Sequence, residues 1–348
     1  AADGAIIVIN GKAGVEAGTE KAWDYCEKYG IPRAFFVTNM DDENADYVKV
    51  IEQLRELYGK RIAPFHLPIR EGGKFTGVVN VVTLKGRTFT GGGKWAERDI
   101  PADVQDDLDT TREALMEAVA ETNEEYMDRY FEGGEFTVDE IIDALRLNVN
   151  EGNVVPVQCG SGLLGYGIAN LLTTCVEFLP SPMRDNIQIF GKDPRTDKEY
   201  NVDYDSRRPF SAYVFKTIVD PFIGKYSLVK VCSGVLKPED VMYNQGQDIE
   251  EKLNKLYVIR GNKTEEVKEL HAGDIGAIGK LSAKTGDTLC TKNNVVMYAR
   301  TEMSKPYTYK SYKAKNKGDE DKISQALAKL MEEDLTLKTV NDSANRQT

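Results

Sequence analysis

Apolar runs alternate with amphipathic segments along the first seventy residues of the chain. The runs at residues 5–9, 34–37 and 62–67 predict strands that are buried on both faces, because such strands read as continuous apolar stretches. Residues 19–29 and 45–58 have apolar positions at helical spacing, and a Gly-Ile-Pro sequence ends the first of these helices. Strands that alternate with helices in this way predict a parallel sheet covered on both faces.

The pattern changes from about residue 71. A strand at 75–84 and the triplet Gly91-Gly92-Gly93 predict a hairpin punctuated by glycines. Two acidic helices, an apolar strand and a further helix are predicted after it: 102–130, 137–148, 153–159 and 168–178. Because the strand and the last helix resume the earlier alternation, residues 71–150 are predicted to be an insertion into one parallel sheet.

Beyond Ser206 the helical period disappears. Short apolar runs take its place, spaced by Gly, Pro and Asn: 210–218, 224–233, 253–260, 265–270 and 275–280. This rhythm predicts a β-sandwich or β-barrel of about 90 residues.

The last fifty residues predict a β-α-β unit. Apolar and polar residues alternate over 307–314, a helix is expected at 319–333, and a second strand at 335–340. A lone unit of this kind cannot close a core, and the chain opens without Met and enters a strand almost at once. We therefore expect both ends to be cut from a longer protein.

The composition agrees with several folded domains and argues against membrane-spanning, disulfide-rich and histidine-rich metal-binding proteins. The 348 residues are 41% hydrophobic and 29% charged, which suits roughly two to four globular domains. No run approaches the roughly 18 apolar residues that span a bilayer. Five scattered cysteines and two histidines argue against a disulfide scaffold and a multi-histidine metal site. We expect a reduced, cytoplasmic protein.

Charge is divided unevenly along the chain. Residues 206–348 carry a balance of +5, whereas the preceding residues carry −16. Such an asymmetry is consistent with two surfaces that face different partners, one of which could be nucleic acid.

A Gly-x-Gly-x-x-Gly sequence at 160–165 follows a predicted strand and precedes a predicted helix. On its own this is the fingerprint of dinucleotide binding, which would make the chain an NAD-dependent oxidoreductase. The fingerprint also needs a second strand about 20 residues later that ends in an acidic residue. Here that stretch is Leu179-Pro180-Ser181-Pro182-Met183, which cannot form a central strand. A tight strand–helix turn is the better interpretation.

A polar cluster, Thr38-Asn39-Met40-Asp41, ends the predicted strand at 34–37. The carboxyl ends of parallel strands are where α/β folds bind ligands. The Asp41 carboxylate could accept hydrogen bonds from N1–H and the exocyclic amine of guanine, a donor pair that adenine lacks, and backbone N–H groups after Ser161 could bind guanine O6. The alternative is that Asp41 only caps the following helix.

At this point the sequence resembles bacterial elongation factor G, a translational GTPase. Several stretches carry the resemblance in collinear order: Gly30-Ile31-Pro32-Arg33, Phe75-Thr76-Gly77-Val78-Val79, Asp99-Ile100-Pro101-Ala102, Phe178-Leu179-Pro180-Ser181-Pro182, Asp220-Pro221-Phe222-Ile223-Gly224-Lys225, Ala272-Gly273-Asp274-Ile275 and Thr285-Gly286-Asp287-Thr288-Leu289-Cys290. They span nearly the whole chain.

The resemblance implies a multidomain α/β plus β fold. Residues 1–70 and 151–205 would form a truncated P-loop-GTPase-type domain, and 71–150 would be its α+β inserted subdomain. Residues 206–298 would be a β-barrel second domain, and 299–348 the first half of a ferredoxin-like third domain.

The resemblance also implies partners and ligands. The full-length protein would bind GTP or GDP with Mg²⁺ and act on the ribosome in translocation. The barrel would face ribosomal RNA and the acidic insert the ribosomal stalk protein. We expect a cytoplasmic monomer without membrane contact.

The guanine-binding motif departs from the family pattern. The family has Asn-Lys-x-Asp where this chain has Thr38-Asn39-Met40-Asp41, so only the base-reading carboxylate is kept. Asn39 replaces a lysine whose methylene groups would cover the base and whose ammonium would reach the phosphate loop. Ser161-Gly162 stands where the family often has Ser-Ala. The resemblance therefore places base binding at Thr38, Asn39, Asp41, Ser161, Gly162 and Leu163, with weakened or altered guanine affinity.

No Gly-x-x-x-x-Gly-Lys-Ser/Thr sequence occurs in the 348 residues. Phosphoryl transfer needs that loop, Mg²⁺ and a residue that orients water. We therefore expect no catalytic residues and no metal ligands in this fragment, which by itself should neither hydrolyse GTP nor hold a nucleotide firmly. The full-length protein would be a GTPase.

Other functions stay open beside this interpretation. A ribosome-protection protein that releases tetracycline or a stop-codon release GTPase would share the architecture. Thr38 and Asn39 also fit a ribosome-binding paralogue that no longer hydrolyses nucleotide.

The remaining candidates have plain structural interpretations. His66 and Cys159 are expected in the core, and His271 in a turn of the barrel. Lysines and tyrosines alternate between residues 305 and 317, a pattern compatible with RNA contact, although one solvated strand face is the preferred interpretation.

Overall fold

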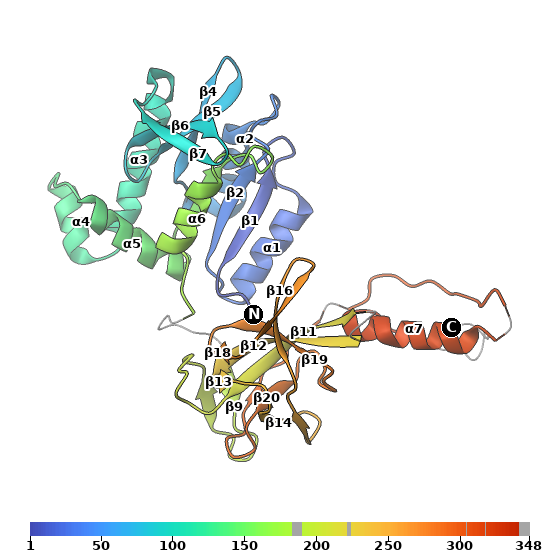
Figure 1. Cartoon of the computed structure of the whole chain (residues 1–348). Helices are drawn as coiled ribbons and strands as arrows, with labels where there is room; N and C mark the ends of the chain where they lie inside the picture. Colours follow the sequence, from blue (N-terminus) through green and yellow to red (C-terminus); the bar gives the residue numbers. More distant parts are fainter. Residues whose placement is uncertain (183–189, 221–223, 304, 317, 341–348) are drawn as a thin grey trace. The chain divides into compact units, whose positions relative to one another are not determined.

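A computed structural model describes residues 1–182, 190–220, 224–303, 305–316 and 318–340 (Figure 1). The chain divides into two compact units, an N-terminal unit of residues 2–181 and a C-terminal unit of residues 182–348 that also takes in Ala1. Each unit has its own hydrophobic core.

A four-stranded parallel sheet forms the centre of the N-terminal unit. Its strands, in spatial order, are β1 (Ala5–Asn10), β2 (Arg33–Thr38), β8 (Val155–Cys159) and β3 (Ile62–Pro64). Helices connect or flank them: α1 (Ala17–Lys28), α2 (Tyr47–Tyr58) and α6 (Ile168–Glu177), with a 3-10 turn at Gly59–Arg61. The predicted parallel sheet is confirmed.

The first strand is less buried than its apolar run predicts. β1 lies at an edge of the sheet, and Ile6 and Val8 on one of its faces are 39% and 58% exposed. The central strand β2 is covered on both faces: Phe35 and Val37 on one face are fully buried, and Phe36 on the other face is 3% exposed. The prediction of burial on both faces is therefore confirmed for β2 and wrong for β1.

The third apolar run does not form one strand. It divides between β3 in the parallel sheet and β4 (His66–Glu71) in a separate antiparallel sheet. Phe65 stands between them, donating its backbone N–H to Val157 O at 2.9 Å and accepting from Val81 N at 2.9 Å. The run is apolar apart from the buried His66 because both sheets are buried here, so nothing in the sequence marks the change.

The second sheet is an antiparallel meander. Its spatial order follows the sequence: β4, β5 (Lys74–Asn80), β6 (Lys85–Gly91) and β7 (Lys94–Arg98). The glycine triplet makes the turn between β6 and β7, where Gly91, Gly92 and Gly93 all have positive φ. The predicted hairpin is confirmed, although the strand expected at 75–84 ends at Asn80 and residues 81–84 form the turn into β6.

Three helices follow, where two were expected. They are α3 (Gln105–Ala120), α4 (Glu124–Phe131) and α5 (Val138–Glu151), after a 3-10 turn at Ala102–Val104. The predicted helix at 102–130 is interrupted because Asn123 caps a new helix, its side chain accepting from Tyr126 N at 2.8 Å.

The C-terminal unit is β-rich and largely antiparallel. Its main sheet has eight strands, in spatial order β15 (Ile249–Lys252), β14 (Val241–Asn244), β20 (Thr288–Cys290), β11 (Ser211–Asp220), β12 (Gly224–Ser233), β19 (Ile275–Gly279), β16 (Leu256–Arg260) and β17 (Lys263–Val267). Two small sheets accompany it: β10 (Glu199–Asn201) with β9 (Phe190–Lys192) and β21 (Met297–Tyr298), and β13 (Val235–Leu236) with β18 (Leu270–His271). The predicted class, α/β plus β, is confirmed.

A buried carboxylate organises one end of this β-unit. Asp287 is 2% exposed and accepts hydrogen bonds from Asn244 Nδ2 at 2.9 Å, Lys284 N at 2.9 Å and Gln247 Nε2 at 2.6 Å. Arg300 pairs with its other oxygen at 2.8 Å. Asp287 therefore joins β14, the 284–287 turn and the segment after β21.

The last segment forms its helix but neither of its strands. α7 (Glu320–Glu333) agrees with the prediction, whereas residues 307–314 and 335–340 have no strand structure. A strand is held by pairing with a neighbour, and none of the described residues pairs with either segment. Tyr307 and Tyr309 are accordingly 93% and 97% exposed, so the strand-face interpretation of the lysine–tyrosine pattern is wrong.

Candidate functional site

The predicted base-binding residues come from two loops at one edge of the parallel sheet. These loops follow β2 and β8, which are neighbouring strands and end at the same edge. Gly160 N donates to Val37 O at 2.9 Å and Met40 N donates to Gly160 O at 3.1 Å. Gly162 N reaches Thr38 Oγ1 at 3.4 Å. The two loops, about 120 residues apart in sequence, therefore lie against each other.

The loop after β2 presents Asp41 to solvent. Asn39 has a φ of 60°, a left-handed conformation that Asn tolerates better than most residues. Asp41 is exposed, and no described residue donates a hydrogen bond to its carboxylate. Asp46 caps α2 instead, its side chain accepting from Lys49 N at 3.0 Å. The helix-cap interpretation of Asp41 is wrong, and its carboxylate is available to a ligand.

The neighbouring carboxylate has a local partner. Asp42 accepts from Asn44 N at 2.8 Å and from Asn44 Nδ2 at 3.1 Å, and Lys12 lies 3.5 Å away. The Asn44 hydrogen bonds, with a smaller contribution from Lys12, lower the pKa of Asp42. Asp42 therefore shapes the loop while Asp41 stays open.

The loop after β8 folds back on itself. Ser161 is fully buried; its N–H donates to Tyr166 O at 2.9 Å and its Oγ accepts from Leu164 N at 3.2 Å. This leaves Gly162 exposed and Leu163 86% exposed at the tip. Helix α6 begins only at Ile168, so the glycine sequence does not lead straight into a helix as a dinucleotide fingerprint requires.

Two glycines of this loop differ in what surrounds them, which gives a paired prediction. A Cβ on Gly160 would overlap the carbonyl oxygen of Tyr166 and lie 2.6 Å from Phe36 Cζ, whereas a Cβ on Gly162 would lie 3.8 Å from Thr38 Oγ1. We expect Gly160→Ala to lower the free energy of unfolding by about 2 kcal/mol, as overpacking does. Gly162→Ala should change it by less than about 0.5 kcal/mol. Urea unfolding of the two variants tests this, and equal stabilities would contradict it.

A residue that the sequence did not single out fixes the first loop. Arg70, on β4, donates from Nη2 to the carbonyl oxygens of Met40 and Ala45, both at 3.0 Å, and from Nη1 to Gly73 O at 2.9 Å. One guanidinium thus ties both ends of the 40–45 loop to the antiparallel sheet. A lone arginine in a strand carries no pattern that would have identified it.

Removing this tie should loosen the loop. We expect Arg70→Met to leave the carbonyl groups of Met40 and Ala45 without their donor and to speed backbone amide exchange over residues 40–46 about 10-fold, since a hydrogen bond to a charged donor contributes about 1.5–3 kcal/mol. Hydrogen–deuterium exchange measured by mass spectrometry checks this. Unchanged exchange in the loop would show that Arg70 does not restrain it.

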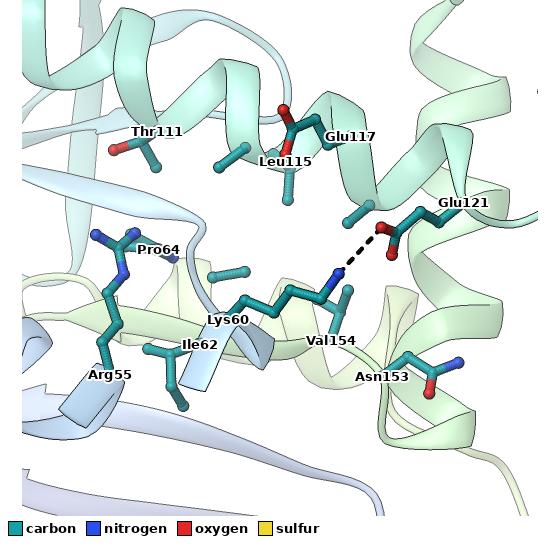
Figure 2. A pocket seen from close by; sticks show the side chains of 13 residues that line it. Arg55, Lys60, Ile62, Pro64, Thr111, Leu115, Glu117, Glu121, Asn153 and Val154 are labelled. Atoms are coloured by element: carbon teal, nitrogen blue, oxygen red, sulfur yellow. Dashed lines mark hydrogen bonds and ion pairs between the residues drawn. The ribbon is translucent and has the colours of Figure 1, made fainter. Parts of the chain in front are cut away.

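A separate hollow of about 90 Å³ lies near the amino-terminal ends of β3 and β8, at the opposite end of these strands from the loop pair (Figure 2). It is bounded by the end of α2, by β3, by α3 and by the segment that enters β8. Lys60 and Glu121 form an ion pair at 3.1 Å beside it. None of the predicted base-binding residues lines this hollow, so the candidate site is the loop pair alone.

His66 and Cys159 are buried, as expected of structural residues, whereas His271 lies in a short strand and not in the expected turn. His66 is 4% exposed and Cys159 is 2% exposed, and burial raises the pKa of the Cys159 thiol. His271 is half-exposed in β18 and lies 3.0 Å from Glu269. Among the described residues, no group of three or more His, Cys, Asp or Glu side chains is arranged to hold a metal ion. None of the described helices is long and apolar enough to cross a membrane.

Comparison with known proteins agrees with this fold. Residues 1–181 match the family model "Elongation factor Tu GTP binding domain", residues 209–292 match "Elongation factor G domain 2", and residues 303–348 match "Elongation Factor G, domain III". Elongation factor G of Chlamydia trachomatis serovar D is 36% identical over 99% of this chain, which covers 51% of that protein. A crystal structure of a Thermus thermophilus protein superposes with a TM-score of 0.82 at 31% identity, covering 99% of this chain and 49% of that one.

The chain therefore belongs to the family of the elongation factor Tu GTP binding domain. Two further matched domains and the curated relative carry the description of elongation factor G, so the resemblance to an elongation factor G-like translational GTPase is confirmed. The chain spans about half the length of the relatives it matches. The domain limits inferred from the sequence stay a prediction.

Proposed function

We propose that this chain contains the guanine-reading part of an elongation factor G-like translational GTPase. The observation that carries the proposal is the meeting of the Thr38–Asp41 loop with the Ser161–Leu163 turn, where Gly162 N lies 3.4 Å from Thr38 Oγ1. An exposed carboxylate and an exposed backbone turn then face one ligand position at the carboxyl edge of a parallel sheet.

Each group has a defined task in this proposal. The Asp41 carboxylate accepts hydrogen bonds from N1–H and the 2-amino group of guanine. The N–H group of Leu163, at the exposed tip of the turn, donates to guanine O6, and the N–H group of Gly162 joins it when it leaves its long hydrogen bond to Thr38 Oγ1. Adenine offers an acceptor at N1 and no 2-amino group, so Asp41 selects against it. Ser161 positions the turn through its bond from Leu164 N and does not touch the base.

Thr38 and Asn39 should bind guanine less tightly than the residues that the family has at these two positions. The Thr38 hydroxyl accepts from Gly162 N at a long distance of 3.4 Å, whereas an amide would offer both a donor and an acceptor to the turn. Asn39 is exposed and too short to cover a base as a lysine stem does. We expect a guanine affinity below that of relatives with the Asn-Lys-x-Asp sequence.

The same family membership supports the wider role. The complete protein would bind GTP or GDP with Mg²⁺ through residues outside the guanine loops and act on the ribosome in the cytoplasm. The β-rich unit would contact ribosomal RNA and the acidic helices α3–α5 the stalk protein. Because the 348 residues contain no Gly-x-x-x-x-Gly-Lys-Ser/Thr sequence, we expect this chain by itself to bind nucleotide weakly and not to hydrolyse it.

One observation favours a second candidate, a ribosome-binding paralogue that no longer uses nucleotide. Both replaced motif positions, Thr38 and Asn39, weaken base binding and neither is compensated by a described neighbour. The two candidates differ in a simple measurement, saturation-transfer NMR of GDP and ADP with this chain. Signals for GDP that exceed those for ADP support the guanine site, and equal signals support the paralogue.

A further inference from the structure

The turn that donates to guanine O6 in our proposal is rich in glycine. Four of the eight residues at 160–167 are glycines, which give the backbone more conformational freedom than other residues allow. Of the remaining four, Leu163 and Leu164 are exposed, whereas Ser161 is fully buried and Tyr166 packs against the hydrophobic core. Ser161 and Tyr166 are therefore the side chains that can fix the turn.

The backbone of Tyr166 closes the turn. Its carbonyl oxygen accepts from Ser161 N at 2.9 Å, which joins the two ends of the segment 161–166. On either side of it Gly165 and Gly167 have positive φ, 71° and 78°, a conformation that glycine adopts without the strain of a side chain. Whatever holds Tyr166 in place therefore also fixes the closed end of the turn.

The ring of Tyr166 packs against the antiparallel meander. It stacks on Phe89 of β6, with 4.7 Å between the ring centroids and 18° between the ring planes. Phe89 in turn packs at 5.4 Å on Phe75 of β5, which is 5% exposed. The backbones also come close here, since a Cβ on Gly165 would lie 3.9 Å from Gly93 N in the turn between β6 and β7 (Figure 1). A row of three aromatic rings thus connects the turn to a buried residue of the meander.

We propose that Tyr166 is a positioning residue of the base site. Its ring, held by Phe89, keeps the turn in the shape in which the Leu163 N–H can donate to guanine O6. Tyr166 acts through the turn and does not touch the base. Stacked aromatic pairs contribute more than the apolar area that they bury, so an aliphatic side chain at this position should not replace the tyrosine. This role rests on the proposed function, since it concerns the same guanine site.

Dissociation constants for GDP, obtained by saturation-transfer NMR titration of the whole chain, test the proposal. We expect Tyr166→Leu, which loses the ring, to weaken GDP binding about 5-fold, and Tyr166→Phe, which keeps the ring, to stay within about 2-fold of wild type. Phe89→Leu removes the other ring of the pair and should have the same effect as Tyr166→Leu, and the double variant should lose no more than either single variant. The control is Tyr126→Leu in α4, which removes a ring that packs on Phe136 at 5.1 Å and should stay within about 2-fold of wild type.

The possible results separate this role from the guanine site itself. A wild-type chain that does not prefer GDP to ADP removes the guanine site and the role of Tyr166 with it. Where that preference is present, GDP binding that Tyr166→Leu leaves unchanged overturns the role of Tyr166 alone, even if amide exchange at residues 162–165 becomes faster. An equal loss in Tyr166→Phe or in Tyr126→Leu overturns it as well. Circular dichroism establishes that Tyr166→Leu is folded, and if it is not, Phe89→Leu replaces it with the same expected loss.

Discussion

Asp41→Asn is expected to change the base preference of the site from guanine to xanthine. The carboxylate accepts two hydrogen bonds from guanine, and hydrogen bonds to a charged group contribute about 1.5–3 kcal/mol each. The amide that replaces it would keep one acceptor for N1–H but would place its NH₂ against the guanine 2-amino group, whereas xanthine has an oxygen there. We expect about a 100-fold loss for GDP relative to XDP, measured as the ratio of the two signals in competitive saturation-transfer NMR.

The matched control is Asp42→Asn, in the same loop and with the same change of charge. Asp42 accepts from Asn44 and does not face the base in our proposal, so its GDP to XDP ratio should stay within about 3-fold of wild type. A ratio that Asp41→Asn leaves unchanged would remove Asp41 from the site. A shift of equal size in both variants would show a general effect of loop charge.

The second large effect is expected in the C-terminal unit, at Asp287. Replacing it with Ala leaves the buried Asn244 amide and the Lys284 N–H without an acceptor, which costs about 1–3 kcal/mol for each group. We expect a loss of about 4 kcal/mol in the free energy of unfolding, seen as roughly 10³-fold faster amide exchange in β11 and β20. Asp274→Ala removes one hydrogen bond, from His271 N, at an exposed position and should cost less than about 1 kcal/mol.

The same carboxylate should contribute to acid sensitivity. Burial raises the pKa of Asp287, but hydrogen bonds from Asn244, Lys284 and Gln247, with the Arg300 charge, outweigh it and hold the pKa below the usual 3.8. A lowered folded-state pKa stabilises the unit above about pH 4 and loses that contribution as pH falls below it. Exchange rates in β11 should therefore rise more steeply between about pH 4 and pH 2.5 in wild type than in Asp287→Ala, after correction for intrinsic rates. Parallel profiles would contradict this.

The sequence predicted the elements that have a clear hydrophobic pattern. It failed where contacts with residues distant in the sequence determine the structure. The run at 34–37 identifies a central strand because both its faces are covered. The equally apolar run at 62–67 cannot show that the chain changes sheets at Phe65. Residues 241–252 form β14 and β15, but the apolar run at 241–243 is short and β15 is mostly charged, since one side of that hairpin faces solvent.

The residues that would bind the base could be predicted from the sequence, whereas the residues that hold the two loops in place could not. Asp41 and the Ser161 turn follow two strands, so their meeting at one sheet edge follows from parallel topology. That Asp46 and not Asp41 caps α2 depends on where the helix begins, a boundary that periodicity sets only to within a few residues. Arg70 acts on the loop from another sheet, and no spacing in the sequence links the two.

The position of Phe65 between the two sheets has a mechanical consequence. Its N–H bonds to β8 and its carbonyl group bonds to the segment after β5, so a single residue belongs to both hydrogen-bonding ladders of the N-terminal unit. Its ring, 1% exposed, packs edge-on against Phe178 with 5.0 Å between centroids. No loose linker separates the two sheets at this point. A force applied to the β4–β7 meander therefore reaches β8, and the turn at its end, through backbone bonds alone.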